Sequence, residues 1–150
     1  MGSVYQATHL TLNAPVAIKV LPLAIARRDP NFAARFLRKA QLAARIRHPN
    51  VITVMDTDHD PATDLHYIVL EYVDGGTVRD LLREGPLDER RAIEIVQKIT
   101  EALACAAEHR IIHRDIKPEN IMLTRDGQVK LADLGLAKDV AESEPDLTLS

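Results

Sequence analysis

The stretch His113-Arg114-Asp115-Ile116-Lys117-Pro118-Glu119-Asn120 decides the fold of this chain, together with Asp133-Leu134-Gly135, which begins 13 residues after Asn120. Carboxylate and amide oxygens of this kind are the ligands that a hard cation such as Mg²⁺ prefers. The plain alternative is a polar turn after a helix, in which Asp and Asn side chains cap backbone groups. Capping would explain no more than one of these residues, so we interpret the two stretches as parts of one functional site.

The composition is typical of a soluble globular domain. The chain has 150 residues, of which 46% are hydrophobic and 27% charged, and its net charge is -3. Without a basic excess, nucleic acid and anionic membrane surfaces are not expected partners. A single cysteine, Cys105, excludes an internal disulfide framework and suits a reducing cytoplasm. We find no signal peptide and no apolar run near the roughly 20 residues of a membrane span, so this segment is expected to be cytoplasmic without membrane contact.

Apolar runs and turn residues predict the elements that surround the two stretches. Strands are expected at 16–21, 51–55 and 67–73, with a turn over 56–64. Helices are expected from Asp29-Pro30-Asn31 to a stop at His48-Pro49-Asn50, over 77–83, and from an N-cap at Asp88. Two short strands should flank Asp126-Gly127. The apolar stripe of the longest helix is predicted at Ala92, Val96, Ile99, Leu103 and Ala106.

The order of these elements predicts an α+β fold. Strands with one helix come first and mostly helix follows, with a change of composition at 74–76. We therefore expect two lobes: an N-lobe over about 1–73, and a hinge with an upper C-lobe over about 74–150. No internal repeat or low-complexity segment is found.

The two stretches resemble the H-R-D-x-x-x-x-N catalytic loop and the D-F-G motif of protein kinases, with Leu134 in place of Phe. Over nearly all of its length the chain resembles bacterial serine/threonine protein kinases of the eukaryotic-like type. The resemblance implies a two-lobed kinase fold and transfer of phosphate from ATP to Ser or Thr of a protein substrate. It also implies roles for single residues. Asp115 would accept the hydroxyl proton, Lys117 would contact the γ-phosphate, and Asn120 and Asp133 would hold Mg²⁺ or Mn²⁺.

The same resemblance implies a nucleotide site in the first half of the chain. Val16-Ala17-Ile18-Lys19 fits the strand whose Lys pairs the α- and β-phosphates, 96 residues before Asp115. Gly2 and Val4 fit the end of the glycine-rich loop, where a missing Cβ lets backbone approach phosphate. Ordinary core packing would account for several of these residues equally well. By resemblance, Val4, Ala17 and Met122 would enclose adenine, Glu71 and Val73 would offer backbone groups to its edge, and Leu70 would be the gatekeeper.

A zinc site is a second interpretation of one segment. Cys105, His109 and His113 are spaced at i, i+4 and i+8, which on a continuous helix would bring a thiol and two imidazoles together. No fourth ligand is evident, and His113 already belongs to the kinase motif. We therefore expect His109 to lie at a helix C-terminus, where a cation is favoured.

The pattern fails at Lys39. In the family this helix carries a Glu that pairs with the strand lysine, but here the run is Arg35-Phe36-Leu37-Arg38-Lys39-Ala40. No acid lies between Asp29 and Lys39, so the helix offers no near substitute. Either Lys39 faces inward and repels Lys19, or its ammonium reaches solvent and the helix moves outward.

The ends of the chain depart from the family pattern as well. Only the last Gly of the glycine-rich loop is present, and no Ala-Pro-Glu follows Asp133-Leu134-Gly135. We therefore expect a fragment whose N-lobe lacks its first strand and whose C-lobe lacks its later helices. The leading interpretation is the catalytic core of an ATP-dependent kinase, which could be membrane-anchored through a segment outside this chain. A pseudokinase that binds nucleotide or acts as a scaffold, or an inactive remnant, is the alternative.

Regulation by phosphorylation is a further expectation from the resemblance. Arg114 precedes Asp115, and in this family such an Arg pairs with a phosphate that orders the activation loop. Thr148 and Ser150 lie where similar bacterial kinases phosphorylate themselves, whereas added charge at Ser143 would be repelled by its acidic neighbours. An ordinary polar loop rich in Ser and Thr is the alternative.

Overall fold

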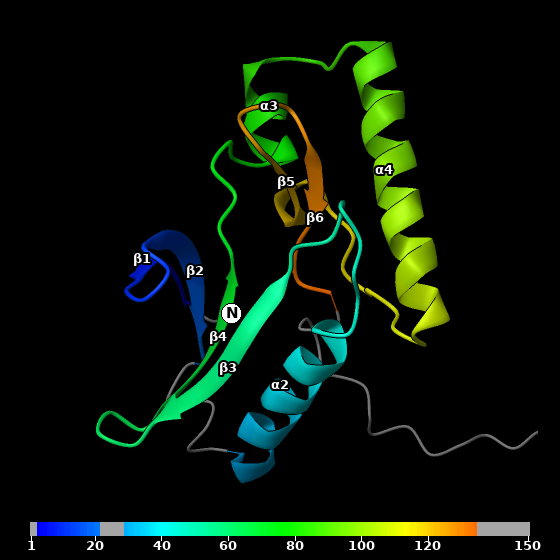
Figure 1. Ribbon diagram of the computed structural model, residues 1–150. Helices are drawn as coiled ribbons and strands as arrows, with labels where there is room; N and C mark the ends of the chain where they lie inside the picture. The colour runs from blue at the N-terminus through cyan, green and yellow to red at the C-terminus, as the bar shows by residue number, and fades with distance from the viewer. Residues whose placement is uncertain (1–2, 22–28, 135–150) are drawn as a thin grey trace, which may run out of the picture.

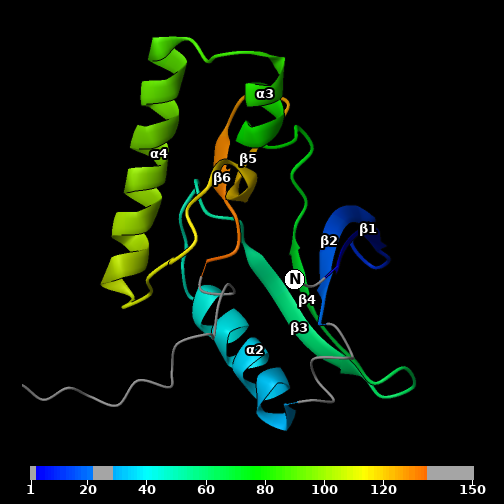
Figure 2. The same cartoon turned by 180° about the vertical axis from the view of Figure 1, so that it is seen from behind.

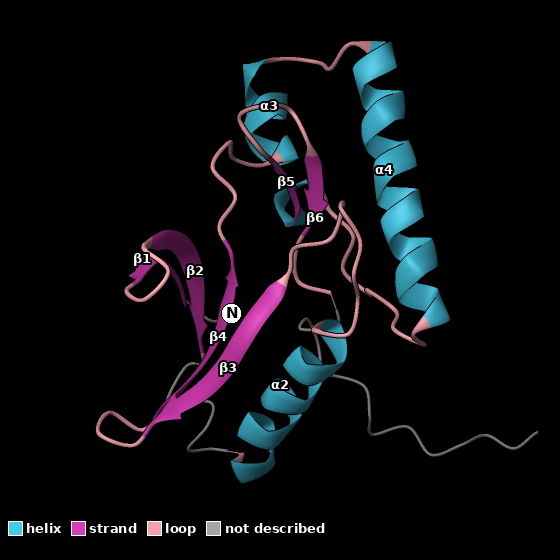
Figure 3. Cartoon of the chain, viewed as in Figure 1, coloured by secondary structure: helices cyan, strands magenta, loops and turns pink. Residues whose placement is uncertain are grey.

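The computed structural model describes residues 3–21 and 29–134, which form a mixed α and β structure (Figure 1). Figure 3 shows an antiparallel sheet with a helix beside it, and a second group of helices with a small sheet. The predicted α+β class is thereby confirmed. In chain order the elements are β1 (Ser3–His9), β2 (Ala14–Val20), α2 (Pro30–Ala43), β3 (Val54–Asp60), β4 (Leu65–Glu71), α3 (Val78–Glu84), α4 (Glu89–Glu108), the 3-10 turn η1 (Pro118–Asn120), β5 (Ile121–Leu123) and β6 (Val129–Leu131).

The larger sheet has the strand order β1-β2-β4-β3, and all neighbouring strands are antiparallel. Side chains alternate along a strand, so Ile68 and Leu70 of β4 point to the same face. On that face they join Phe36 and Ala40 of α2 and Leu21 in one apolar cluster. Both views in Figures 1 and 2 show α2 running beside β3, which agrees with its packing on this sheet.

Helix α2 begins where the sequence predicts and ends earlier. The Asp29 carboxylate accepts a hydrogen bond from the N–H of Asn31 at 3.0 Å, which satisfies one of the free amides of the first turn. The helix ends at Ala43, before the expected stop at residues 48–50. Ile46, which falls inside the expected helix, is instead buried against α4, β5 and β6 in a second apolar cluster. The chain leaves the helix early because it crosses from one core to the other.

The second core lies between α4 and the small sheet β5–β6. Asp88 caps α4 by accepting a hydrogen bond from the N–H of Arg91 at 3.3 Å, as its place in the sequence predicts. Among the described helices none is long and apolar enough to cross a membrane. The buried residues of this core are Ile46, Val51, Val78, Ile95, Ile99, Ala102, Ala106, Leu123, Val129, Leu131 and Leu134.

Hydrogen bonds from Asn50 and Gly75 help to join the two parts of the structure. The side-chain amide of Asn50, which is buried, donates to the carbonyl of Val129 at 2.7 Å, and the N–H of Leu131 donates to the Asn50 carbonyl at 2.8 Å. After β4, the N–H of Gly75 donates to the carbonyl of Leu123 at 2.9 Å. A Cβ at Gly75 would lie 2.5 Å from that oxygen, so this approach requires glycine. The segments on either side of β3 and β4 are thus fixed to β5 and β6.

The predicted boundary between strand and turn before β4 is wrong. We expected a strand at 51–55 and a turn over 56–64, but β3 runs from Val54 to Asp60 and the turn occupies 61–64. The acidic run looks like a loop because Asp is rare in strands. Pairing with β4 overrides that preference, since β3 is the edge strand and its polar side chains can reach water.

The predicted stripe of α4 is only partly right. Ile99 and Ala106 are buried as expected, but Val96 is 65% exposed. Ile95 and Ala102 take the buried positions instead. Both stripes have helical spacing and share two members, so periodicity alone does not choose between them.

Candidate active site

His113 fixes the loop that follows α4. Its side chain is 2% exposed, and its Nε2 lies 2.7 Å from the carbonyl oxygen of Ala132. Since a carbonyl can only accept, Nε2 carries the proton, and Nδ1 can accept the hydrogen bond from the N–H of Asp115 at 3.3 Å. One buried imidazole therefore joins the Asp115 backbone to the residue that precedes Asp133.

Asp115, Lys117 and Asn120 meet in this loop, as the sequence predicts. The ammonium of Lys117 lies 2.7 Å from Oδ2 of Asp115, and the amide nitrogen of Asn120 donates to the same oxygen at 3.1 Å. Asn120 also donates to the Asp115 carbonyl at 2.8 Å. With its amide nitrogen used in this way, Asn120 keeps its side-chain oxygen for another ligand.

The same contacts set the charge of the loop. The hydrogen bond from Lys117 lowers the pKa of Asp115 below its usual 3.8, and the bond from Asn120 acts in the same direction. Conversely, the hydrogen bond to Asp115 raises the pKa of the Lys117 ammonium above 10.5. At neutral pH the loop therefore presents a carboxylate that can accept a proton and a cation beside it.

Asp133 and Lys19 join the two parts of the molecule. The Lys19 ammonium on β2 lies 2.6 Å from Oδ1 of Asp133, which follows β6, and both side chains are largely buried. Asp133 is held near the loop because the N–H of Ala132 donates to the Asn120 carbonyl at 2.8 Å. Asp133 and Arg114 adopt left-handed backbone angles, with φ of 60° and 62°, which are uncommon outside glycine.

The predicted adenine-contacting residues of the larger sheet lie close to Lys19. Val4 is the cross-strand partner of Lys19 in β1–β2, and Ala17 is opposite Leu70 in β2–β4. Val4 is 58% exposed, whereas Leu70 is buried. An exposed valine next to a partly buried lysine is available to contact a ligand.

The other residues predicted to contact adenine lie where β4 leaves the sheet. The N–H of Glu71 donates to the carbonyl of Thr53 at 2.9 Å, so what Glu71 could offer a ligand is its carbonyl. Its carboxylate lies 2.5 Å from the Lys130 ammonium, and Lys130 pairs with Met122 across β5–β6. Val73, two residues after Glu71, is buried.

Lys130 and Asn50 matter to this geometry, and neither stands out in the sequence. Lys130 ties the end of β4 to β6, and Asn50 ties the segment before β3 to the same strand. The available signal for Lys130 is its place between Val129 and Leu131, because alternation puts it on the face opposite the two buried neighbours. Asn50 has no comparable signal, since residues 48–50 look like a simple helix stop.

The structure does not assemble the zinc site considered at Cys105, His109 and His113. The imidazole of His109 lies 2.9 Å from the carbonyl oxygen of Cys105, at the end of α4 as expected, and His113 bonds to the Ala132 carbonyl. Gly2, Ser143, Thr148 and Ser150, to which the sequence also assigned roles, lie outside the described residues.

Lys39 lies half-buried on α2, between the buried Phe36 and Ala43. Helix α2 contains no acidic residue. The carboxylate that reaches Lys19 is that of Asp133, at 2.6 Å.

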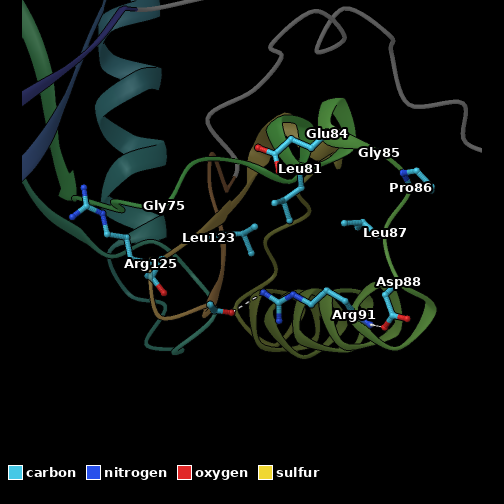
Figure 4. Close-up of a pocket in the computed structure, with 12 residues that line it drawn as sticks. Gly75, Leu81, Glu84, Gly85, Pro86, Leu87, Asp88, Arg91, Leu123 and Arg125 are labelled. Carbon is cyan, nitrogen blue, oxygen red and sulfur yellow. Dashed lines mark hydrogen bonds between the residues drawn. The ribbon is translucent and has the colours of Figure 1, made fainter.

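A hollow of about 580 Å³ lies elsewhere, between α3, the loop that leads to α4 and the β5–β6 turn (Figure 4). The guanidinium of Arg91 donates to the carbonyl of Gly127 at 2.8 Å on its wall. Lys19, Asp115 and Asp133 do not line this hollow, so it is separate from the candidate active site.

Comparison with known proteins identifies the family. Residues 1–149 match the protein kinase domain family. The chain is 45% identical over 151 aligned positions to the serine/threonine-protein kinase PknB of Mycolicibacterium smegmatis, covering 99% of this chain and 24% of that protein. It is 40% identical over 138 positions to the serine/threonine-protein kinase PrkC of Bacillus subtilis, covering 91% of this chain and 21% of that protein.

The chain thus spans about a quarter of the length of these curated relatives. Residues 1–149 of this chain's 150 lie within the match to the kinase family. The chain belongs to the protein kinase domain family and, with PknB and PrkC, to its bacterial serine/threonine kinases.

Proposed function

We propose that this chain is part of a two-lobed catalytic domain that transfers phosphate from ATP to Ser or Thr of a protein substrate. The observation that carries the proposal is the pair Lys19–Asp133, which joins β2 to the segment after β6, and Ala132 of that segment is bonded to the loop that holds Asp115 and Asn120. Phosphoryl transfer asks a protein chiefly to position reactants and to neutralise charge. A lysine, an ionised aspartate and two oxygen ligands gathered at one place suit that task.

The residues present suit Mg²⁺ or Mn²⁺ bound with ATP. The free side-chain oxygen of Asn120 and the carboxylate of Asp133 are hard oxygen ligands, and the Ala132–Asn120 hydrogen bond keeps them near each other. Lys19 neutralises Asp133 in this structure and would turn to the nucleotide phosphates. When bound, Mg-ATP supplies the phosphoryl group and the cation charge.

The chain's own residues would then divide the work. Asp115, ionised because Lys117 lowers its pKa, would orient the substrate hydroxyl and accept its proton. Lys117 would balance charge on the transferred group. The His113–Ala132 hydrogen bond would keep Asp115 in register with Asp133.

The adenine would lie between the two parts of the molecule. Val4 and Ala17 would cover one face and Met122 the other, with the Glu71 carbonyl and Val73 backbone at its edge and Gly2 nearer the phosphates. The support is that Val4 and Ala17 share the sheet with Lys19, while Lys130 links Glu71 to the strand pair of Met122. The protein that contains this chain would act in the cytoplasm on protein substrates.

Lys39 favours a second candidate, a pseudokinase that binds nucleotide without turnover. Without a carboxylate on α2, Lys19 would lack the partner that holds it on the phosphates in this family. The two candidates agree on nucleotide binding and differ on transfer.

One experiment separates them. The complete protein that contains this chain is incubated with labelled Mg-ATP and a generic Ser/Thr substrate, and nucleotide binding is measured in parallel. Transfer that is lost in Asp133→Asn and retained in Asp126→Asn, the same change on the β5–β6 turn, supports the kinase. Nucleotide binding without transfer selects the pseudokinase, and the absence of both overturns the proposal.

A further inference from the structure

The turn between β3 and β4 gathers two imidazoles and a carboxylate far along the chain from the catalytic loop. His59 and His66 are direct cross-strand partners, and their rings stack with centroids 4.2 Å apart at 21°. Nε2 of His59 lies 3.0 Å from Oδ1 of Asp64, which occupies the turn. Strand register, and not sequence spacing alone, brings these three groups together.

His66 has an unused ring nitrogen. Its Nδ1 is buried and, among the described residues, is the one buried side-chain nitrogen or oxygen without a hydrogen-bond partner. A buried polar atom left in this way costs stability, and a bound water, ligand or ion is one of the ways in which such an atom is satisfied. A neutral imidazole carries a lone pair on one nitrogen, which is the form that binds metals.

The surrounding charge also favours a cation. Residues 54–66 contain four aspartates, at 56, 58, 60 and 64, and no Lys or Arg. The potential around the turn is therefore negative. A cation that binds there would meet the two imidazoles with only one carboxylate within reach, a nitrogen-rich donor set that Mg²⁺ and Ca²⁺ do not prefer.

We propose that His59, Asp64 and His66 bind a late first-row divalent metal ion, with Zn²⁺ as the ion of choice, and that the ion links β3 to β4. One ligand atom from each residue lies within 4.8 Å of the others. A tetrahedral Zn²⁺ with bonds of about 2.0–2.1 Å needs them about 3.4 Å apart, so small side-chain rotations suffice. Asp64 can move, because its side chain is 69% exposed, and water would complete the coordination.

Zn²⁺ would replace the direct His59–Asp64 hydrogen bond with one metal bond to each of these two residues. A third metal bond would go to His66. The carbonyl of His66 accepts a hydrogen bond from the N–H of Leu21 at 2.9 Å, so the linked turn is also tied to the end of β2. The plain alternative is a surface His–Asp pair, which contributes little to stability and has no affinity for zinc.

The test uses the purified protein without nucleotide, so its outcome does not depend on kinase activity. Zn²⁺ is titrated calorimetrically in a buffer that does not chelate it, and Co²⁺ is used in parallel for its visible absorption. We expect one Zn²⁺ per chain, and a loss of affinity of at least about tenfold in His59→Gln, His66→Gln and Asp64→Asn. Asp64→Asn should stay folded, because Asn accepts the left-handed backbone at this exposed position, where φ is 56°.

Two control variants should bind Zn²⁺ like the wild type. His109→Gln removes the imidazole at the end of α4 beside Cys105, and Asp133→Asn removes the carboxylate of the candidate active site. Wild-type protein that binds no Zn²⁺, or affinity that survives both His59→Gln and Asp64→Asn, overturns the proposal. Loss of binding in either control would place the ion elsewhere and overturn it as well.

Discussion

Helix α2 packs on β3 and β4 of the sheet that carries Lys19, and Asp133, at the end of the segment that begins at His113, reaches Lys19 itself; the helix and the segment differ in charge. The helix contains Arg35, Arg38 and Lys39 and no acid, whereas the segment ends in the carboxylate that pairs with Lys19. Two ammonium groups 4 Å apart repel by about 4 kcal/mol at an effective dielectric of about 20. Lys19 pairs with Asp133, and α2 has no acid to offer it, so this lysine is held by the carboxylate that follows β6.

The catalytic loop and helix α2 also differ in how well they keep the kinase pattern. Every position of the catalytic loop to which we assigned chemistry is present and hydrogen-bonded, from Asp115 to Asn120. Among the charged positions that the kinase pattern assigns to the described residues, the departure lies at Lys39, on the helix that should hold Lys19 in place. The chemistry and the control of Lys19 are therefore separable by mutation.

The largest effect is expected on the loop side. Asp115→Asn in the complete protein should lower kcat by about 10²–10⁴-fold, because the group that accepts the hydroxyl proton is lost. ATP affinity should stay near the wild-type value, since Asp115 acts on the hydroxyl and not on the nucleotide. Steady-state kinetics and nucleotide binding measure the two effects. Retained turnover, or a large loss of ATP affinity, would contradict the assigned role.

A smaller gain is expected on the helix side. Lys39→Glu should raise kcat about tenfold, because an acid at this position of α2 would attract Lys19 as the partner acid does in this family. The matched control is Arg38→Glu, the same change of charge at the neighbouring exposed position. Equal activity of Lys39→Glu and the parent protein at saturating Mg-ATP would show that Lys39 does not limit turnover.

Self-phosphorylation would show that the catalytic loop is active although α2 lacks an acid to pair with Lys19. We expect an active form to modify Thr148, and Ser150 with it, with Arg114 as the partner of the new charge. Thr148→Ala should then reduce activity a few-fold. Mass spectrometry of wild type beside Asp115→Asn measures the modification. An unmodified Thr148 in an active sample rejects the prediction, and equal modification in both samples assigns it to another kinase.

The smallest effect is expected on the stability of the fold at acidic pH. The folded pKa of Asp115 is below 3.8, so its pair with Lys117 adds stability above that pH and loses it as pH falls through the folded value. Denaturant unfolding between pH 5 and pH 3 should show a weaker loss of stability in Asp115→Asn than in wild type. Lys117→Met should behave likewise, because Lys117 is the main cause of the shift. A wild-type slope in Lys117→Met would assign the shift to another group.

The sequence correctly predicted the features that depend on neighbouring residues. The helix starts at Asp29 and near Thr77, the N-cap at Asp88 and the turn at residues 126–127 are encoded by a few adjacent residues, and the structure has all of them. The spacing within the motif likewise predicted that Asp115, Lys117 and Asn120 lie together.

The misses depend on tertiary partners. The acidic strand β3 exists because β4 pairs with it, and the buried stripe of α4 is selected by the elements that it packs against. Neither the Lys19–Asp133 distance nor the link from Glu71 to Lys130 can be derived from spacing, since each joins segments far apart in the chain. The stacked His59 and His66 needed the register of β3–β4.

The most direct measurement is a double-mutant cycle on Lys19 and Asp133, using the free energy of unfolding of wild type, Lys19→Met, Asp133→Asn and the double variant. If Asp133 holds Lys19, the effects of the two substitutions on the free energy of unfolding should be non-additive, with a favourable coupling of about 0.5–3 kcal/mol. The parallel cycle of Lys19→Met with Lys39→Met should give no favourable coupling. Additive effects for Lys19 and Asp133 would contradict the central claim that the carboxylate after β6, and not helix α2, holds this lysine.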